Sequence, residues 1–303
     1  MILYMNRRDV PEAEQGVLSS AVIDYVVGRA NEYERRCRAL YGRYIGVPQI
    51  HRGEDENDVR AEANYAKYIV DIIRGYFLSE PVKYDCNDKD KKDSQAKLSL
   101  VSTVEAKLDR QSGNLIRHNA VDENKDGLCD LCGKEIDISA VMAAYHSQNI
   151  ATVDQRIGKA MGIYGESCEL LYASTEEQPR PRSAVYAPDQ IVLVQDDTVE
   201  HKELFALWFE QRKRTDRSRY YAVTVYTATQ YQQYESDDLD KENYIYHPVG
   251  APVPHFFDGV PVVCYENNEE RQGDFEQVAN LIDARNELLS DRLTDKRKFV
   301  NSI

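Results

Sequence analysis

The feature that most constrains the fold is a long stretch of β-type sequence in the second half of the chain. From Ser183 onward, five apolar or alternating runs follow one another: SAVYA, QIVLVQ, LFALWFEQ, YYAVTVYTATQYQQYE and NYIYHPV. Turn signals separate them, including Pro188-Asp189, Asp196-Asp197 and the charged segment RKRTDRS. Alternation of apolar and polar residues is typical of half-buried antiparallel strands. With the further run GVPVVCY at Gly259 to Tyr265, this predicts a β-rich section.

Helical periodicity precedes this section. Between Ser20 and Leu40, apolar residues recur at three- and four-residue steps, which places them on one helical face. A stronger pattern runs from Ala61 to Leu78 and stops at Glu80-Pro81, because the residue before a proline avoids the helical region. A third helical region covers residues 138–172, although its end, IYGESCELLYAS, fits a strand equally well.

A final long helix is predicted after the segment ENNEERQGDFEQ. Asp274 is a candidate N-cap with Gln277 three residues later, which is a capping-box pattern. The apolar stripe of this helix comprises Phe275, Val278, Leu281, Ile282, Leu288, Leu289 and Leu293. Helices first, a β-rich centre and a terminal helix together predict an α+β fold.

Composition divides the chain further. Residues 87–114 are rich in charged and small polar residues, as expected of an insertion. We therefore expect a helical N-terminal part at 1–86, a polar insertion at 87–137, an α+β remainder at 138–265 and the start of a long helix at 266–303.

Charge and cysteine content exclude several classes of protein. The 303 residues carry a formal charge of −14, which argues against a broad basic face for nucleic acid. The longest apolar runs fall far short of the ~20 residues of a membrane-spanning helix, and the N-terminus lacks a signal core, so we expect a soluble intracellular protein with no membrane contact. Six scattered cysteines are too few for a disulfide framework, and the four isolated ones are most simply buried and reduced.

No catalytic constellation is visible. The histidines at 51, 146, 201, 247 and 255 are dispersed, and GESC around Ser167 lacks the Gly-x-Ser-x-Gly pattern of a nucleophile elbow. The spacing of Gly158, Gly162 and Gly165 does not match a phosphate-binding loop, so helix packing is the expected role. We expect no enzymatic activity. A nuclease that uses paired carboxylates is the weakest of the alternatives, since no pair with a supporting His or Lys stands out.

One segment has the composition of a calcium loop. Positions 1, 3, 5, 7 and 9 of such a loop would be Asp122, Asn124, Asp126, the carbonyl of Leu128, and Asp130. Gly127 sits where the loop turns, but position 12 is Gly133 rather than a glutamate. Calcium binding and a merely polar turn both remain open.

The same segment also has half of a zinc site. Cys129 and Cys132 have the Cys-x-x-Cys spacing of a zinc knuckle, and His118 is a possible third ligand. A fourth ligand is not visible. Either ion would fold the insertion within residues 118–135 rather than run catalysis, and no other cofactor is expected.

Several motifs resemble a known family in their order along the chain. They are YGRYIGVPQIHR at 41–52, NYAKYIVDIIRGYFLSEPVKY at 64–84, IGKAMGIYGESCELLYA at 157–173, APDQIVLVQDDTVEHKELFALWF at 187–209, and VPVVCYENNEERQGDFEQVANLIDARNELLSDRLTDKRKF at 260–299. These segments resemble the phage portal proteins of the SPP1 type. The last is the most specific, and the resemblance covers nearly all of the chain except residues 87–137.

The resemblance implies a structural subunit of a ring, usually a dodecamer, at the portal vertex of a tailed-phage or prophage head. Double-stranded DNA would pass through the ring without sequence-specific binding during packaging and ejection. The implied partners are other copies of the chain, the large terminase subunit, scaffold or major capsid protein, and head-completion proteins. The protein would reside in the host cytoplasm during assembly and then in the virion.

The resemblance also assigns parts of the chain. Residues 1–260 would form the outer wing, and residues 275–299 would form the first stem helix, with Phe275, Val278, Ile282 and Leu289 packing against a second stem helix. The family continues into a clip, that second helix and a crown, so we expect a truncated subunit. The 21 tyrosines suit subunit contacts, and the acidity suits a DNA conduit. The alternative is an interaction or adhesion module stabilised by calcium or zinc.

Overall fold

The computed structural model describes residues 1–10, 17–49, 58–80, 82, 103–104, 118–119, 148–174, 181–240, 244–255, 257 and 259–301. The chain forms two compact units: Met1–Glu80 with Thr152–Ile303, and Pro81–Ala151. In the second unit, strands β2 (Thr103–Val104) and β3 (His118–Asn119) pair antiparallel. The expected insertion at 87–137 falls within this second unit. The following description concerns the first unit.

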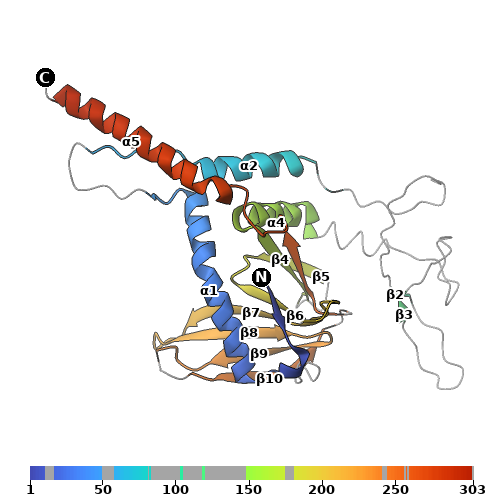
Figure 1. The fold of residues 1–303 in the computed structure, drawn as a ribbon. Coiled ribbons are helices and arrows are strands. Elements are labelled where there is room, and N and C mark those ends of the chain that lie inside the picture. Colours follow the sequence, from blue (N-terminus) through green and yellow to red (C-terminus); the bar gives the residue numbers. More distant parts are fainter. Residues whose placement is uncertain are drawn as a thin grey trace, which may run out of the picture. The chain divides into compact units, whose positions relative to one another are not determined.

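A six-stranded sheet forms the centre of this unit (Figure 1). Its order is β1 (Ile2–Met5), β6 (Ile191–Asp196), β7 (Glu203–Lys213), β8 (Arg219–Tyr226), β9 (Gln230–Ser236) and β10 (Tyr246–Pro254). The predicted β-rich section is confirmed, with one refinement. The run YYAVTVYTATQYQQYE contains two strands, because a turn closed by Thr227 N donating to Gln230 O (2.9 Å) separates β8 from β9. Strand β1, which pairs parallel with β6, was not predicted from the sequence.

A second sheet has three antiparallel strands in the order β11 (Val262–Glu266), β4 (Glu166–Ala173) and β5 (Pro181–Tyr186). Strand β4 resolves the ambiguous end of the third helical region. Helix α4 (Ile150–Tyr164) stops at Gly165, whose φ of +86° belongs to the left-handed region, and the strand begins at the next residue.

The remaining helices are α1 (Ser20–Ile45), the short 3-10 helices η1 (Arg7–Asp9) and η3 (Glu276–Val278), α2 (Tyr65–Phe77) and α5 (Ala279–Asn301). The α+β prediction is confirmed. Among the helices in the described parts of the chain, none is long and apolar enough to cross a membrane.

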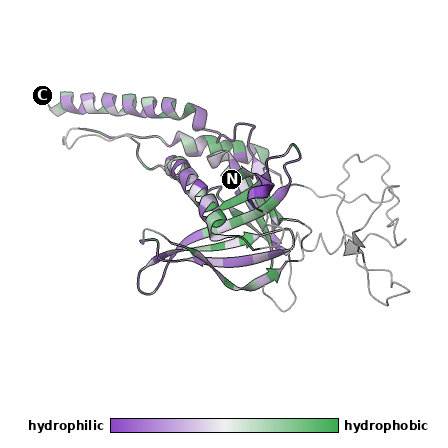
Figure 2. Ribbon diagram, turned by 60° about the horizontal axis from the view of Figure 1, so that its bottom comes forward, coloured by the Kyte–Doolittle hydropathy of each residue, from purple (hydrophilic) through white to green (hydrophobic). Residues whose placement is uncertain are grey.

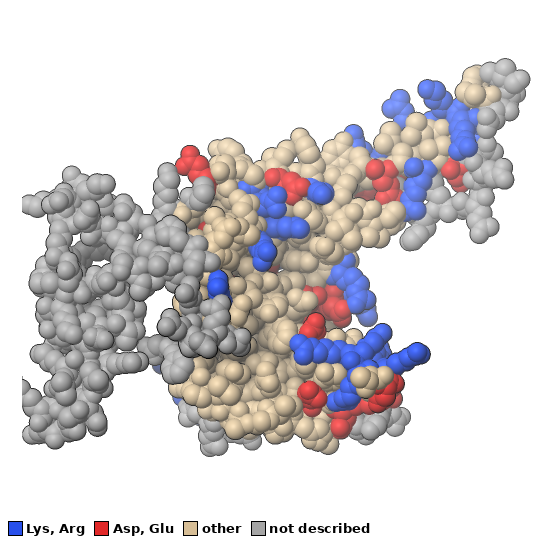
Figure 3. All heavy atoms as spheres, turned by 180° about the vertical axis from the view of Figure 1, so that it is seen from behind, with Lys and Arg blue, Asp and Glu red and all other residues tan. Residues whose placement is uncertain are grey.

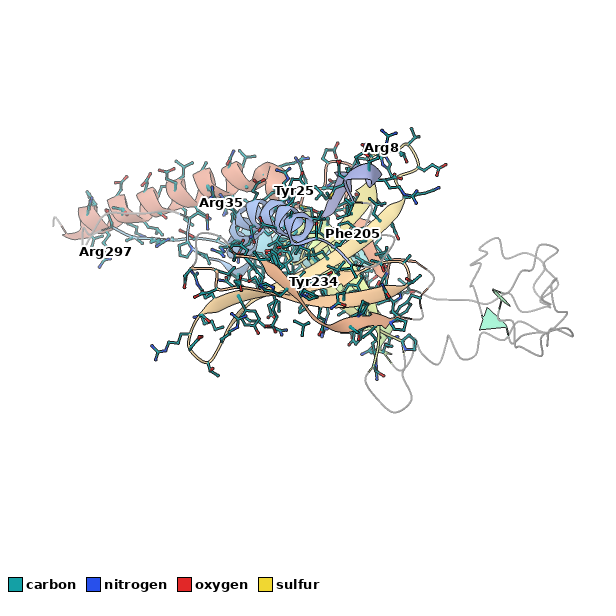
Figure 4. The ribbon with its side chains drawn as sticks, turned by 90° about the horizontal axis from the view of Figure 1, so that it is seen from below. Arg8, Tyr25, Arg35, Phe205, Tyr234 and Arg297 are labelled. Atoms are coloured by element: carbon teal, nitrogen blue, oxygen red, sulfur yellow. The ribbon has the colours of Figure 1, made fainter. Side chains whose placement is uncertain are left out.

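Side chains of the central strands point alternately to the two faces of the six-stranded sheet, so that this sheet lies between α1 and the three-stranded sheet. Val192 and Val194 of β6 pack against α1, whereas their neighbours Ile191 and Leu193 pack against the three-stranded sheet. All four are buried because the six-stranded sheet is covered on both faces, which explains the continuous apolar run IVLV. Phe205, labelled in Figure 4, belongs to the layer under α1. Hydrophobic residues concentrate on these strands, whereas α5 is mostly hydrophilic (Figure 2).

A third buried cluster lies where four helical segments meet. Leu40 and Tyr44 come from α1, Ala66 and Val70 from α2, Ile163 from α4, and Phe275 from the residue before η3. This cluster places the start of α5 against the other helices. It therefore positions the site described next.

Candidate functional site

The most specific sequence motif, ENNEERQGDFE, forms a closed loop between β11 and α5. We call residues 266–276 the junction. The side-chain amide of Asn267 donates to Gln272 O (3.0 Å) and to Asp274 Oδ1 (2.9 Å). Asn268 donates to the same carbonyl (2.8 Å), and its Oδ1 accepts from Gln272 N (2.8 Å). Two asparagines therefore close the loop, because an amide side chain can donate and accept at once.

The predicted capping box at Asp274 and Gln277 is wrong. The carboxylate of Asp274 is engaged by Asn267, and the residue at the N-cap of η3 is Phe275, which makes no side-chain capping bond. Glu276 instead accepts from Gly273 N (3.0 Å). Burial raises the pKa of Asp274, and the hydrogen bond from Asn267 opposes this shift only in part. Loop closure thus outcompetes helix capping for this carboxylate.

Glycines on α4 allow the junction to approach closely. Asp274 N donates to Gly162 O (2.9 Å), and Asn267 N donates to Gly165 O (2.8 Å). A Cβ atom on Gly162 would lie 2.6 Å from the Asp274 carboxylate, and one on Gly165 would collide with the carbonyl of Arg271. A Cβ atom on Gly158 would likewise lie 2.6 Å from Leu78 Cδ1, so the packing role predicted for Gly158 and Gly162 is confirmed. Gly165 instead adopts the positive φ of the turn between α4 and β4.

Arg36 on α1 holds the junction from the other side. Its guanidinium binds both carboxylate oxygens of Glu276, at 3.0 and 2.7 Å. The same group donates to the carbonyls of Tyr164 (3.1 Å) and Arg271 (3.0 Å). One partly buried side chain therefore connects α1, the end of α4, the junction and η3. Such bidentate, charge-assisted contacts fix orientation as well as adding stability.

The first turns of α5 are attached to α1 and α2. Arg43 on α1 forms a bidentate ion pair with Asp283, at 2.6 and 2.7 Å. The guanidinium of Arg285 lies 4.2 Å from the ring centre of Tyr65 on α2. Both contacts hold the helix to its neighbours at its N-terminal half.

An extended segment runs along α5, and we call residues 58–64 the strap. Thr294, Ser290 and Asn286 accept hydrogen bonds from the backbone amides of Val59, Ala61 and Ala63, at 2.9, 3.1 and 3.1 Å. The spacing matches, since two residues of extended chain span about 6.7 Å and four helical residues about 6 Å. All three side chains are buried.

The strap was missed at the sequence level. The apolar periodicity places the beginning of the second helix at Ala61, whereas in the structure the helix starts at Tyr65. Asn64 caps that helix by accepting from Lys67 N (2.9 Å). The available signal was the run of small polar residues Asn286, Ser290 and Thr294 at four-residue steps, which form one buried face of a helix otherwise exposed.

The four residues predicted to contact a second stem helix have different surroundings. Phe275 is completely buried in the third cluster, and Val278 and Ile282 pack against that cluster. The expectation that Phe275 packs against a second stem helix is wrong, because α1, α2 and α4 already cover it. Leu289 is 38% exposed, so its contact with another helix stays a prediction.

The metal hypotheses remain untested. Asp122, Asn124, Asp126, Leu128, Cys129, Asp130 and Cys132 lie outside the described residues, and His118 lies in β3, of which only the backbone pairing is described. Among the residues that the structure describes, no group of three or more His, Cys, Asp or Glu side chains could hold an ion.

Helix α5 presents two further groups of exposed side chains. Leu281, Leu288 and Phe299 are exposed and share one face. Glu287, Asp291 and Asp295 follow at four-residue steps beside this face and are also exposed. Charged side chains of both signs lie along this helix (Figure 3). The helix projects from the sheets, with its C-terminal turn away from both of them (Figure 1).

Comparison with known proteins identifies the family. A search among curated proteins finds no match. The family model described as phage portal protein, SPP1 Gp6-like, matches residues 23–303. This range includes most of α1, all of α2 and α4, both sheets except β1, the junction and all of α5. The chain therefore belongs to the SPP1 Gp6-like phage portal protein family.

Proposed function

We propose that this chain is a structural subunit of the ring at the portal vertex of a tailed-phage or prophage head, through which DNA is packaged and ejected. The junction supports this proposal most directly. It holds α5 to α1 through Arg36 and to α4 through Gly162, so that the helix has a fixed direction relative to the sheets. A ring needs this rigidity, because each subunit must present its helix in the same way.

Two faces of α5 fit two different neighbours. The face with Asn286, Ser290 and Thr294 is covered by the strap. The apolar face with Leu281, Leu288 and Phe299 is exposed and suits a helix of the same or an adjacent subunit. Rings arise from such contacts between two different surfaces of identical subunits.

The overall charge suits the DNA. A formal charge of −14 makes the chain as a whole repel phosphates, so that DNA passes without adhering. The role is structural and non-catalytic. Its partners are the large terminase subunit, scaffold or major capsid protein, and head-completion proteins, first in the host cytoplasm and then in the virion.

The test is the assembly state of the purified chain. Mass photometry and negative-stain microscopy should show closed rings with a central hole. Changing Leu288 and Phe299 together to Glu should abolish them, whereas Val199→Glu should not, although Val199, in the loop between β6 and β7, is an even more exposed apolar residue. Only monomers at tens of micromolar, or rings that survive the double change, would contradict the proposal.

A further inference from the structure

Two cysteines face each other across the three-stranded sheet. Cys168 on β4 and Cys264 on β11 are register partners of an antiparallel pair. Their sulfur atoms lie 2.8 Å apart, and one thiol donates a hydrogen bond to the other. Cys168 is fully buried, whereas Cys264 is partly exposed. The sequence reading treated both as isolated, because 96 positions separate them.

The backbone hydrogen bonds between β4 and β11 show that this pair lies at a non-bonded position, where opposite side chains are closest. Leu171 N donates to Pro261 O (2.8 Å) and Asn267 N donates to Gly165 O (2.8 Å). Bonded pairs therefore recur at every second position between these two, and the cysteine pair falls on a non-bonded position. Cα atoms at such positions are about 4.5 Å apart, within the range of about 4.4–6.8 Å that a disulfide requires.

We propose that Cys168 and Cys264 form an oxidative modification site, at which a two-electron oxidant joins β4 to β11 by a disulfide. The hydrogen bond between the two thiols favours the loss of one proton from the pair, which this reaction requires. The bond lowers the pKa of Cys168 against the effect of burial, and together with burial it raises the pKa of Cys264. The pair thus loses one proton more readily than an isolated buried thiol, such as Cys37, whose pKa is raised by burial.

The reaction balances with hydrogen peroxide as the oxidant. The thiolate of Cys168, the sulfur whose pKa is lowered, attacks one peroxide oxygen, the O–O bond breaks and hydroxide leaves, which gives a sulfenic acid on Cys168. The Cys264 sulfur then attacks Cys168 Sγ, the S–O bond breaks, and the departing hydroxide takes the thiol proton of Cys264 as water. The deprotonated pair and one peroxide give one disulfide, one water and one hydroxide.

The cross-link would act on the segment that leads into the junction. Strand β11 ends at Glu266, and Asn267 begins the asparagine-closed part of the loop. A bond at Cys264 would therefore fix the register of the strand two residues before the junction. If the proposed portal role holds, the bond would stay open in the reducing host cytoplasm and form after the particle is released.

The test uses the full chain with Cys86, Cys129 and Cys132 changed to Ser, so that Cys37, Cys168 and Cys264 remain. After peroxide treatment, alkylation of free thiols in denaturant and peptide mass mapping should show one cross-linked peptide joining Cys168 to Cys264, with Cys37 alkylated. The Tm of the oxidised protein should exceed that of the reduced protein by ~5–10 °C, because the bond closes a long loop of the unfolded chain.

Two further variants complete the test. Cys264→Ser should give no cross-link and no difference in Tm between oxidised and reduced samples. Cys37→Ser, the matched loss of a buried cysteine, should retain both effects. A sulfinic acid at Cys168 or Cys264 beside an alkylated partner, or a cross-link that includes Cys37, would overturn the proposal. Since the oxidised and reduced comparison uses one protein, it remains decisive even if a single variant fails to fold.

Discussion

Ser290 in the middle of α5 holds both backbone groups of Ala61. The amide nitrogen of Ala61 lies 3.1 Å from Ser290 Oγ and donates to it, and the carbonyl oxygen of Ala61 lies 3.0 Å from the same hydroxyl. Ser290 is completely buried. The Ser290 side chain thus satisfies the backbone N–H and C=O groups of Ala61, as a neighbouring strand would in a sheet.

Removing the hydroxyls beneath the strap should detach it. Ser290→Ala leaves the amide of Ala61 without its acceptor, and Thr294→Val does the same to Val59 while preserving the shape of the side chain. Each change should lower the free energy of unfolding by about 1–3 kcal/mol, the usual cost of an orphaned buried group. Urea titration measures this loss, and Thr294→Ser, which keeps the hydroxyl, should have less than half the effect.

Hydrogen exchange locates the effect. In Ser290→Ala the amide of Ala61 should lose protection, while amides in β7 exchange as in the unaltered protein. If the amide of Ala61 stayed protected, the hydroxyl would not be its essential acceptor.

Substitutions of two glycines distinguish the cost of backbone strain from the cost of a steric clash. Gly165 and Gly250 both have positive φ, at +86° and +72°, but only Gly165 has neighbours within 4 Å of a hypothetical Cβ. Gly250→Ala should therefore cost about 1 kcal/mol, the strain of a left-handed alanine. Gly165→Ala should cost about 3 kcal/mol or more, because the junction must also move away from its Cβ. If both variants lost the same free energy of unfolding in a denaturant titration, the backbone at Arg271 would be able to move away from the added Cβ at no cost.

Asp189 should make stability depend on pH. Burial raises its pKa above the ordinary value of 3.8, and the charge of Glu34 adds to the shift. The folded protein thus favours the neutral carboxyl, so stability from this group is complete below pH 3.8 and is lost as pH rises through the folded pKa. Asp189→Asn, neutral throughout, should be more stable than the unaltered protein at pH 7, and the gain should shrink toward pH 4. Urea midpoints across this range measure it, and a gain that grew on acidification would contradict the assigned shift.

Local sequence patterns predicted the helices and strands whose form follows from the spacing of their own apolar residues. Apolar periodicity placed α1 within a few residues, and the continuous apolar run of β6 follows from a sheet covered on both faces. The strap could not be found in this way. Its partners on α5 are more than 200 positions away, and its extended form comes from hydrogen bonds to Ser290 and Thr294 rather than from its own composition.

The junction was recognised as a motif, but its mechanism was not predicted. Asp274 looked like an N-cap because the spacing to Gln277 was right. Asn267, only seven positions earlier, competes for the same carboxylate, and the closed loop brings the two together. Spacing rules consider one helix at a time, so they miss such competition. The roles of Arg36 and Gly165 depend in the same way on chain segments that meet only in the folded protein.

The outer edge of β10 offers few donors to another strand. Asp237 N donates to Ile245 O (3.0 Å), and His255 N donates to Thr229 O (3.1 Å), which marks these positions as facing β9. Pro248, opposite Tyr234, and Pro254, opposite Gln230, occupy the alternate positions that face outward. Proline has no N–H group, so both outward donors are removed, a common protection of edge strands. The outward amide of Tyr246 is bound to Ser20 Oγ (2.9 Å).

Restoring the two outward donors should make the protein associate through this edge. The double change of Pro248 and Pro254 to Thr keeps the pairing with β9, because neither position donates to that strand, so unfolding should shift by less than about 1 kcal/mol. Association should appear as a concentration-dependent rise in sedimentation coefficient beyond that of the unaltered protein. Val249→Thr places the same residue at an inward-facing position of the same strand and should leave association unchanged. If the control associated equally, added β-propensity rather than the outward N–H groups would be responsible, and the prolines would not protect the edge.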